Sequence, residues 1–376
     1  MKRLVLVGPG HAHLYVLEAL ALAPLPGVET VLVSLGARQL YSGMVPGWIA
    51  GDYVLEQLSF ELEGLARAAG ARLEPGGAAE LRANSRELQL GDGRVLGYDV
   101  ASFDIGSLPA GTELPGVEEH ARVLKPLERT LTVLTEATRE SGPLLVVGGG
   151  AAGVELALCL QARTGRPTTL IERGEEVPRG MPRSARRLVR GLLARRRVAL
   201  RTEATLVSLS PAAAQLASGE SLPFTTCVWA TGARAPELFV RSGAAVDARG
   251  YLAVEDTLRS PSHPELFATG DCAGFISGQH VPKAGVYAVR QGPVLSANLR
   301  SALTGQGPLQ SYRAQRGFLS LLNAGDGTAV GAWKGLAFQG RAMWQLKDAI
   351  DRRFMARFQR LAGQRPGSRQ APLSEE

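Results

Sequence analysis

The sequence predicts an α/β fold with two Rossmann-like domains, the second inserted in the first, followed by a small C-terminal region. Two observations lead to this prediction. A unit that reads strand, glycine-rich turn, helix and strand stands near the N-terminus and returns about 140 residues later. Two short apolar runs that end in glycine lie further along the chain, as the later strands of doubly wound sheets would.

The first unit begins with Lys2–Val7, a nearly continuous apolar run that is typical of a buried parallel strand. The turn Gly8–His13 (GPGHAH) follows, and after a helix Thr30–Ser34 is the second strand. The turn departs from the pattern G-x-G-x-x-G because His13 stands at the third glycine. Ser34 stands where an acidic residue usually binds a ribose hydroxyl. Taken alone, this unit leaves dinucleotide binding and a purely structural turn equally open.

The second unit begins with Pro143–Val147, and its turn Gly148–Gly153 (GGGAAG) matches the full pattern. The first glycine permits the tight turn, the second lets the backbone approach a pyrophosphate, and the third allows helix and strand to pack closely. Glu172 ends the next strand and suits a ribose 2′-hydroxyl, which favours NADH over NADPH. Arg173 beside it works against this preference, because an Arg can hold a 2′-phosphate.

Between and beyond these units the chain predicts the domain organisation. Leu81–Leu90 and Val95–Phe103 read as two strands, and the Gly- and Pro-rich segment Pro109–Pro115 predicts the crossing into the second domain. A return crossing is expected near Gly250. The predicted domains are residues 1–115 with 251–316, residues 116–250, and a C-terminal region, 317–376, of short strands and an amphipathic helix.

The composition excludes several classes of protein. The 45 glycines and 22 prolines have no period, which excludes a collagen-like chain. No apolar stretch reaches the ~20 residues that span a bilayer, and no signal sequence is visible, so we expect a cytoplasmic protein. The three cysteines, Cys159, Cys227 and Cys272, lie far apart, which predicts no disulfide framework. The net charge of +7 comes without a nucleic-acid-reading motif, so no nucleic acid is expected as a partner.

Two later segments, Trp229–Gly232 and Phe267–Asp271, are the short apolar strands that end in Gly and Gly-Asp. Taken in chain order, the two glycine turns and these two segments resemble the two-dinucleotide-binding-domain flavoproteins of the pyridine nucleotide-disulfide oxidoreductase superfamily. The resemblance is to the type II NADH dehydrogenases in particular. The sequence is most similar to the flavoprotein domain found fused N-terminal to selenide, water dikinase. This similarity lies in the segments Gly10–His13, Tyr41–Gly47, Trp229–Ala235 and Pro282–Gln291.

This resemblance implies FAD as the cofactor of the first site and NAD(P)H, with NADH favoured, at the second. Asp271 would bind the FAD ribitol, and Ala78 would meet the adenine through its backbone. The cofactor-binding residues expected at the first site are Gly8, Gly10, His11, Ala12, Ser34, Tyr41, Ser42, Gly43, Met44, Ala78, Gly106, Gly270, Asp271 and Ala284. Those expected at the second site are Gly148, Gly150, Ala152, Gly153, Glu172 and Gly232.

The resemblance also implies two catalytic residues. Glu155 would face the contact between nicotinamide and flavin and position it; the alternative is a polar helix residue without a role. A helix that starts near Ala284 would aim its N-terminus at the flavin N1/C2 carbonyl, where reduced flavin carries negative charge, and Lys283 would add to that. The alternative for Lys283 is a solvated surface lysine.

Cysteine chemistry and metal binding are not expected. The sequence contains no C-x-x-C pair, and Ser42 stands where some NADH oxidases and peroxidases carry a cysteine beside the flavin. We therefore predict electron transfer without a thiol relay. His11 and His13 have no further His or Cys cluster nearby, so no metal site is predicted.

The C-terminal region carries an apolar stripe among basic residues. The stripe is formed by Leu346, Ile350, Phe354, Phe358 and Leu361. Residues 341–370 hold eight Arg or Lys against two Asp. Two interpretations remain open for residues 340–362: a helix on the inner face of a membrane, or a helix packed on the flavin domain or a homodimer partner.

The predicted function is that of an FAD-dependent NADH dehydrogenase-like oxidoreductase. Hydride would pass from NADH to FAD N5, and electrons would then pass to a small quinone-like acceptor. The alternative is a flavin-bearing binding or regulatory module, or a reductase of a protein partner, linked to selenium metabolism.

Overall fold

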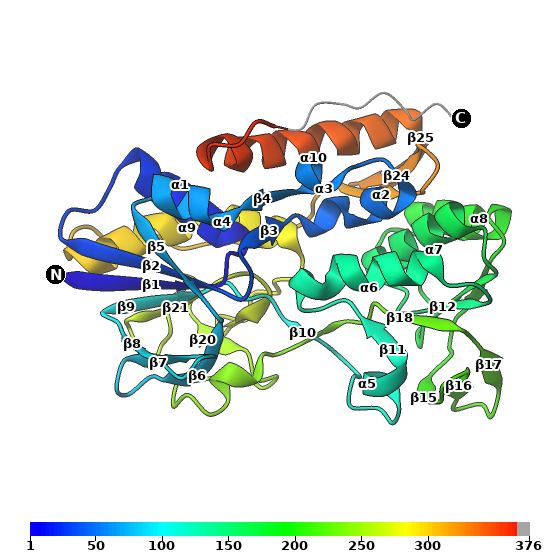
Figure 1. Cartoon of the computed structure of the whole chain (residues 1–376), viewed down its shortest axis with the longest axis horizontal. Coiled ribbons are helices and arrows are strands. Elements are labelled where there is room, and N and C mark those ends of the chain that lie inside the picture. Colours follow the sequence, from blue (N-terminus) through cyan, green and yellow to red (C-terminus); the bar gives the residue numbers. More distant parts are fainter. Residues whose placement is uncertain (367–376) are drawn as a thin grey trace.

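The computed structural model describes residues 1–366 and contains two parallel sheets that lie side by side (Figure 1). The first sheet has the strand order β21-β9-β1-β2-β5, and all its neighbours pair in parallel. Its strands are β1 (Lys2–Val7), β2 (Val28–Ser34), β5 (Ala71–Pro75), β9 (Val100–Phe103) and β21 (Leu266–Ala268). Strands from both ends of the predicted first domain therefore meet in one sheet.

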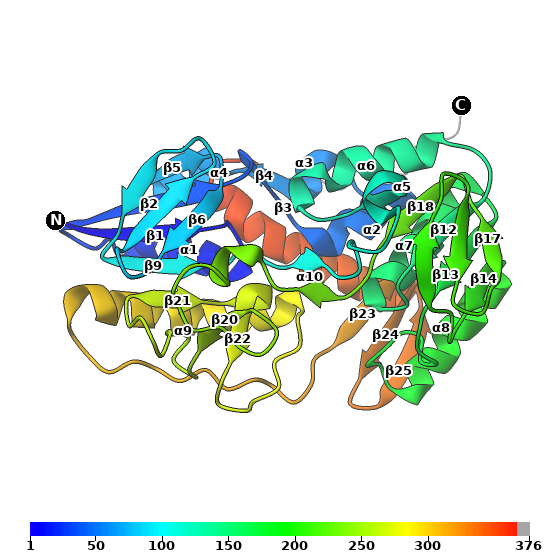
Figure 2. The same ribbon diagram turned by 90° about the horizontal axis from the view of Figure 1, so that it is seen from below.

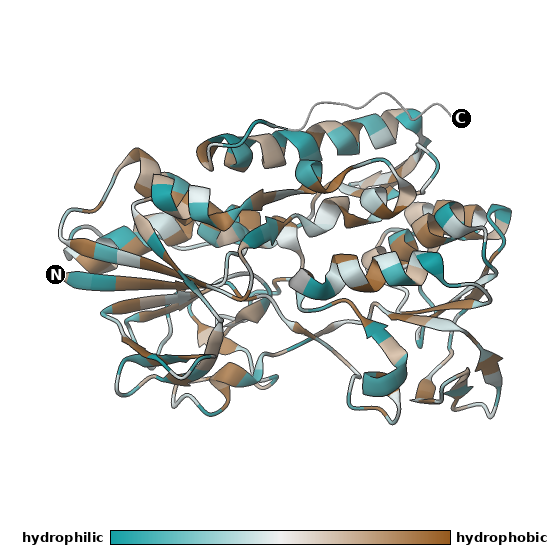
Figure 3. Cartoon of the chain, viewed as in Figure 1, coloured by the Kyte–Doolittle hydropathy of each residue, from teal (hydrophilic) through white to brown (hydrophobic). Residues whose placement is uncertain are grey.

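The second sheet repeats this design with the order β11-β18-β12-β13-β14, again with parallel neighbours only. Its strands are β11 (Ala121–Val123), β12 (Leu144–Val147), β13 (Thr168–Ile171), β14 (Val198–Arg201) and β18 (Thr226–Trp229). The predicted α/β fold with two Rossmann-like units is confirmed. Figure 3 shows the apolar residues concentrated along these central strands, as expected for strands buried on both faces.

Helices cover one face of each sheet, and small antiparallel sheets cover the other. The helices are α1 (His11–Leu22), α2 (Val45–Ala50), α3 (Leu55–Leu58), α4 (Leu62–Ala68), α5 (Val117–His120), α6 (Leu127–Arg139), α7 (Ala151–Thr164), α8 (Arg183–Arg195), α9 (Gly285–Thr304) and α10 (Arg341–Leu361), with short 3-10 turns η1 (Ser42–Met44), η2 (Glu237–Phe239) and η3 (Gly270–Cys272). The two helical faces share one apolar core, because α2 packs against α7.

The covering sheets correct two strands of the sequence prediction. The first covering sheet consists of β6 (Ala78–Arg82), β7 (Glu87–Leu90) and β8 (Val95–Gly97), and the second of β15 (Leu206–Leu209), β16 (Ala213–Leu216) and β17 (Ser221–Pro223). The predicted single strand 81–90 is wrong, because the chain turns between β6 and β7, where Arg86 takes the left-handed φ of 55°. The predicted strand 95–103 is likewise two strands, and only β9 joins the parallel sheet.

One short strand pair and one packing contact mark the passages between the sheets. β10 (Leu108–Pro109), on the way into the second sheet, pairs with β19 (Ala233–Arg234), on the way back. Two further short pairs lie within the predicted first domain, namely β3 (Arg38–Leu40) with β4 (Ser59–Glu61) and β20 (Leu252–Val254) with β22 (Ala273–Phe275). Phe239 already packs on Phe103 of the first sheet, with ring centroids 5.3 Å apart. The domain boundary at Gly250 stays a prediction, and these contacts favour a return crossing nearer to residue 233.

The C-terminal region forms a third unit that touches both others. β23 (Ser320–Asn323), β24 (Ala329–Trp333) and β25 (Leu336–Gly340) make an antiparallel sheet. From it α10 runs back over the first domain (Figure 2). The predicted apolar stripe of α10 divides: Phe358 is fully buried, whereas Leu346 and Ile350 are 38% and 45% exposed. Residues 367–376 of the predicted region lie outside the described residues.

Candidate functional site

The first glycine turn joins β1 to α1 at the carboxyl edge of the first sheet. Gly8 has a φ of 88°, and a methyl group there would come within 2.6 Å of the carbonyl oxygen of Asp104. Gly10 is extended and is the N-cap of α1. These two positions bring the end of β9 against the start of α1, so the turn leaves no room for larger residues.

His13, at the position of the third glycine, is part of the packing rather than a defect in it. The ring is fully buried: Nδ1 lies 2.6 Å from the carbonyl oxygen of Gly8, and Nε2 lies 2.8 Å from Oγ of Ser102 on β9. Burial lowers the pKa of His13 to about 4, so the imidazole is neutral at pH 7. The histidine therefore ties the turn to the neighbouring strand through two hydrogen bonds.

Asp104 is a residue of this site that the sequence reasoning missed. It directly follows β9, and its Oδ2 accepts hydrogen bonds from the backbone N–H groups of Ala12, at 2.7 Å, and His13, at 3.3 Å. The side chain is 4% exposed, and burial raises its pKa to about 7. A polar residue at the carboxyl end of a predicted parallel strand was the signal that could have found it.

Asp271 stands beside this turn on η3 and contacts the second domain. Ser107 donates a hydrogen bond to Asp271 Oδ2 at 3.3 Å, and Lys125 Nζ lies 3.6 Å from the same oxygen. Lys125 also donates to Ser107 Oγ at 2.6 Å. Lys125 follows β11 of the second sheet, so this three-residue cluster bridges the two domains next to the predicted flavin site.

Other residues predicted for the first site are already engaged within the protein. The hydroxyl of Ser34 is buried and donates to the carbonyl oxygen of Gly36 at 2.8 Å. Lys283 donates to the carbonyl oxygen of Ala273, and its ammonium lies 3.9 Å from the centre of the Tyr251 ring. Lys283 is thus partly buried and held by protein groups rather than a solvated surface lysine. Ala78 begins β6, and Gly106 has the left-handed φ of 71° between β9 and β10.

The second glycine turn joins β12 to α7 and has the same backbone frame. Gly148 has a φ of 115°, and a methyl group there would come within 2.4 Å of the carbonyl oxygen of Ala230. Gly150 is the N-cap of α7, and space beside it is open. A methyl group at Gly153 would come within 1.8 Å of the carbonyl oxygen of Gly148. Here the third glycine is required by the backbone itself.

Glu172 stands at the end of β13, where the sequence predicts the ribose-binding acid. Its Oε2 accepts the N–H of Gly149 at 2.7 Å, and its Oε1 accepts the N–H of Gly174 at 3.0 Å. The carboxylate thus connects the glycine turn to the loop after β13. Arg179 hydrogen bonds through its N–H to the carbonyl oxygen of Gly149, and its guanidinium lies near Gly232.

A buried cluster of charged groups lies between α7, η1 and α10. Lys347 donates to Asp351 Oδ2 and to the carbonyl oxygen of Gly43, both at 2.8 Å, and the hydroxyl of Tyr41 donates to Asp351 Oδ1 at 3.1 Å. Glu155 accepts the backbone N–H of Asn323 at 2.8 Å, and burial raises its pKa to about 7 although Lys347 opposes the shift. The sequence reasoning named Glu155 and Tyr41 but missed Lys347 and Asp351.

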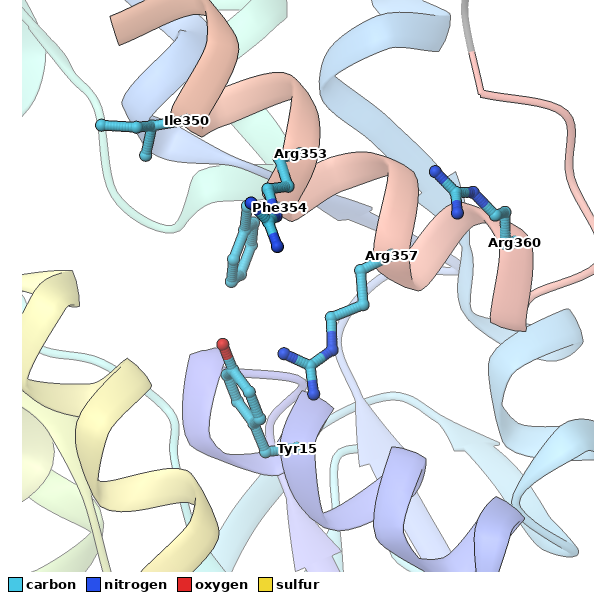
Figure 4. Close-up of a pocket in the computed structure, with 6 residues that line it drawn as sticks. All are labelled: Tyr15, Ile350, Arg353, Phe354, Arg357 and Arg360. Atoms are coloured by element: carbon cyan, nitrogen blue, oxygen red, sulfur yellow. The ribbon is translucent and has the colours of Figure 1, made fainter. Parts of the chain in front are cut away.

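An open groove of about 600 Å³ runs along α10 above α1 (Figure 4). Ile350 and Phe354 supply its apolar wall, and Tyr15 of α1 lies opposite them. Arg353, Arg357 and Arg360 make its rim basic. Phe354 connects the groove to the turn, since its ring lies 4.8 Å from that of Tyr41 and 5.6 Å from that of His11.

Comparison with known proteins supports the likeness drawn from these features. The family model described as "Pyridine nucleotide-disulphide oxidoreductase" matches residues 2–292. A NADH dehydrogenase-like protein of Mycobacterium tuberculosis is 29% identical over 301 residues, which cover 73% of each chain. A type II NADH:quinone oxidoreductase of Staphylococcus epidermidis is 23% identical over 390 residues, which cover 94% of each chain.

The fold itself also has a solved counterpart. The sulfide:quinone oxidoreductase of Aquifex aeolicus superposes with a TM-score of 0.80, covering 96% of this chain and 92% of that protein, at 17% identity. The match extends through the C-terminal region, so β23–β25 and α10 belong to the shared architecture.

Proposed function

Because the chain belongs to the pyridine nucleotide-disulphide oxidoreductase family, we propose that it carries electrons from NADH through FAD to a small quinone-type acceptor. The chain is an NADH dehydrogenase-like oxidoreductase, and FAD and NADH are its cofactors. The observation that carries the quinone proposal is the likeness to a type II NADH:quinone oxidoreductase over 94% of both chains. The link to selenide, water dikinase stays a prediction.

The first glycine turn fits the diphosphate of FAD. The extended Gly10 precedes the N-terminus of α1, where the helix dipole attracts phosphate although Asp104 already accepts the N–H groups of Ala12 and His13. The buried hydroxyl Oγ1 of Thr269 has no hydrogen-bond partner within residues 1–366, and it directly precedes Gly270 and Asp271. A buried polar atom without a partner is expected beside a ligand site. Gly8, Gly10, His11, Ala12 and Asp271 would hold FAD, which supplies the hydride-accepting ring when bound.

The second glycine turn would hold NADH. The N-terminus of α7 offers N–H groups to the pyrophosphate, and Glu172 fixes Gly149 in place through a 2.7 Å hydrogen bond. Glu155 lies near the start of α7, is partly buried and is close enough to Lys347 for their charges to interact. We assign Glu155 the role of orienting the nicotinamide and stabilising the positive charge that it gains as hydride leaves.

The groove along α10 would receive the acceptor. Its apolar wall of Ile350 and Phe354 suits a planar quinone with an apolar tail, and Phe354 leads to Tyr41 beside the predicted flavin site. Reduction of a quinone to a hydroquinone takes two electrons and two protons. The hydrogen-bonded chain Tyr41–Asp351–Lys347 holds protons at this place, so it is the proposed local proton source.

Two features of the cysteines argue that the electrons pass without a thiol relay. Cys159, Cys227 and Cys272 are all free and buried. Burial raises the pKa of Cys227 and Cys272 to about 12, and that of Cys159 well above its usual value. A thiol that stays protonated is a poor nucleophile, so none of the three suits disulfide exchange.

We propose membrane contact through the exposed apolar residues near the groove. These exposed residues are Leu346 and Ile350 on α10, together with Trp333, Leu336 and Phe338 of the C-terminal sheet. Within residues 1–366 no helix is both long and apolar enough to cross a bilayer. The Ile350→Glu variant should co-sediment less with anionic phospholipid vesicles than the unmodified protein. Equal co-sedimentation would refute the contact.

The proposed reaction is tested on the flavin-loaded protein without oxygen. NADH should bleach the flavin absorption, and a soluble quinone should restore it. Bleaching without restoration would refute the quinone, and absence of bleaching would refute the dehydrogenase reaction. Phe354→Ala should raise the KM for quinone without changing the rate of bleaching, whereas the matched control Phe338→Ala, an exposed residue outside the groove, should change neither.

A further inference from the structure

The carboxyl group of Asp104 lies within the phosphate-binding turn of the first site. Its Oδ2 accepts the N–H groups of Ala12 and His13 at 2.7 and 3.3 Å, so it caps α1. Its Oδ1 lies between the two glycines of the predicted FAD motifs: methyl groups at Gly10 and Gly270 would approach it to 2.4 and 2.7 Å. The atom that lies close to both glycines is therefore an oxygen of the Asp104 carboxyl group.

The second turn shows that the fold does not require this acid. Asp104 follows β9 and bonds through its N–H to Val7 at 2.9 Å, and Ala230 follows β18 and bonds to Val147 at 2.9 Å. The two residues thus occupy equivalent places. Ala230 has no polar side chain, so it cannot accept the N–H groups at the start of α7 as Asp104 does at the start of α1. A carboxyl group is therefore a particular feature of the first site.

The surroundings of Asp104 do not favour a negative charge. His13 on α1 is neutral, His11 on the same helix has a pKa lowered to about 4 by burial, and Asp271 and Cys272 on η3 add negative or neutral groups. None of these groups supplies a positive charge at neutral pH. Burial raises the pKa of Asp104 to about 7, and the hydrogen bonds from Ala12 and His13 oppose the rise. A diphosphate at the start of α1 would bring further negative charge.

We propose that Asp104 is a flavin-positioning residue that is neutral in the FAD-loaded protein and couples FAD binding to the uptake of one proton. The inference rests on the proposed function, in that it takes the FAD diphosphate to lie at the turn 8–13. A proton from solvent adds to Oδ1, and no other bond is formed or broken. The neutral acid keeps Oδ2 as the acceptor for α1 and gains an O–H donor that faces the glycines.

The coupling predicts how FAD affinity depends on pH. Below pH 7 Asp104 is neutral in both states, so affinity is constant. Above pH 7 the free protein is ionised and binding must take up a proton, which raises the Kd about tenfold per pH unit until the pKa of the bound state is reached. Between pH 7 and pH 9 we expect the Kd of the full chain for FAD to rise by up to about 100-fold.

The experiment measures FAD binding to the full chain, freed of flavin, by the change in flavin fluorescence at pH 6, 7, 8 and 9. Asp104→Asn keeps an oxygen acceptor for α1 but cannot ionise, so its affinity should be independent of pH and close to that of the unmodified protein at pH 6. Asp99→Asn is the matched control, because Asp99 also accepts a backbone N–H, from Arg3 at 2.6 Å, but is exposed and outside the turn. Its pH dependence should equal that of the unmodified protein.

A second measurement keeps the proposal testable if Asp104→Asn does not fold. FAD added to the unmodified protein in weak buffer at pH 8 should remove close to one proton per FAD from solution. An affinity that is flat from pH 6 to 9, an equal pH dependence in Asp104→Asn, or no proton uptake would overturn the inference. Failure to bind FAD even at pH 6 would instead overturn the proposed function.

Discussion

The two glycine turns of this protein share one backbone frame and fill it with different side chains. In each, the first glycine donates its N–H to the second strand of its unit, at 2.8 Å from Gly8 to Val33 and at 2.9 Å from Gly148 to Ile171. In each, the first residue after the turn, Leu14 or Val154, donates to the N-cap glycine at 3.1 Å. The repeat seen in the sequence is therefore a repeat of hydrogen bonds.

The difference lies in how the third position is filled. In the second turn Gly153 lies against the carbonyl oxygen of Gly148, with Ala230 beside it. In the first turn the carbonyl oxygen of Gly8 instead contacts the ring of His13, with Asp104 beside it. The comparison teaches that a turn can close around a buried polar pair as well as around a small residue, provided that every polar atom has a partner.

The largest effect on activity is expected from Gly153→Ala in the second turn. Gly153→Ala places a methyl group against backbone atoms that cannot yield, which costs ~1–3 kcal/mol or more and shifts the start of α7. The Tm should fall, and bleaching of bound flavin at low NADH should slow by about 10- to 100-fold. Gly150→Ala is the control for stability, because space beside Gly150 is open. A wild-type Tm for Gly153→Ala would contradict the packing argument.

The converse change in the first turn should also be harmful, although it restores the glycine pattern. His13→Gly removes a buried ring and leaves the carbonyl oxygen of Gly8 and the hydroxyl of Ser102 without it. We expect a loss of about 2–4 kcal/mol in the free energy of unfolding, measured by urea denaturation, and a lower FAD content. His13→Ala separates the loss of the ring from the added backbone freedom. If the glycine variant were as stable as the unmodified protein, the histidine would have no packing role.

This difference also shows how much of the two turns could be predicted from the sequence. Strand, turn and helix were predictable in both units because apolar runs and glycines obey local rules. The partners of His13 and the place of Asp104 were not, because they join residues about 90 positions apart in the chain. The buried ion pair of Lys347 and Asp351 could not be predicted either, because the apolar stripe left open whether α10 meets a membrane or the protein, and the local sequence does not show which charged residues beside the stripe are buried. The cysteine positions and the apolar strands of the core could be predicted from the local sequence alone.

The next effect concerns the acid that the second turn has and the first lacks. Glu172→Ala removes the acceptor for the N–H groups of Gly149 and Gly174, which leaves the turn proposed to bind NADH less ordered. We expect the Kd for NADH to rise about tenfold, which corresponds to ~1.4 kcal/mol, with FAD content unchanged. Glu175→Ala, three residues on and without a side-chain bond to the turn among the described residues, serves as the control. An unchanged Kd would show that Glu172 only shapes the loop.

The residues two positions after each turn differ as well, Tyr15 in the first and Glu155 in the second. Burial raises the pKa of Glu155 to about 7, so the residue is neutral below pH 7 and ionised above it. An anion stabilises the positive nicotinamide that hydride transfer leaves, so flavin bleaching by NADH should speed up severalfold from pH 6 to pH 8. In stopped-flow measurements Glu155→Gln should remove this rise. A rise that persists in the variant would have to come from another group.

The smallest effect is expected from Ser34, which occupies the place of the acid in the first unit. Its hydroxyl is buried and donates to the carbonyl oxygen of Gly36, so it shapes the loop after β2 through one neutral hydrogen bond. Ser34→Ala should weaken FAD binding by about fivefold, because such a bond contributes ~1 kcal/mol. Flavin fluorescence measures this change, and it should be smaller than the change in NADH binding caused by Glu172→Ala. If Ser34→Ala had the larger effect, the serine would bind the cofactor directly, and the two units would be more alike in function than in the hydrogen bonds of their loops.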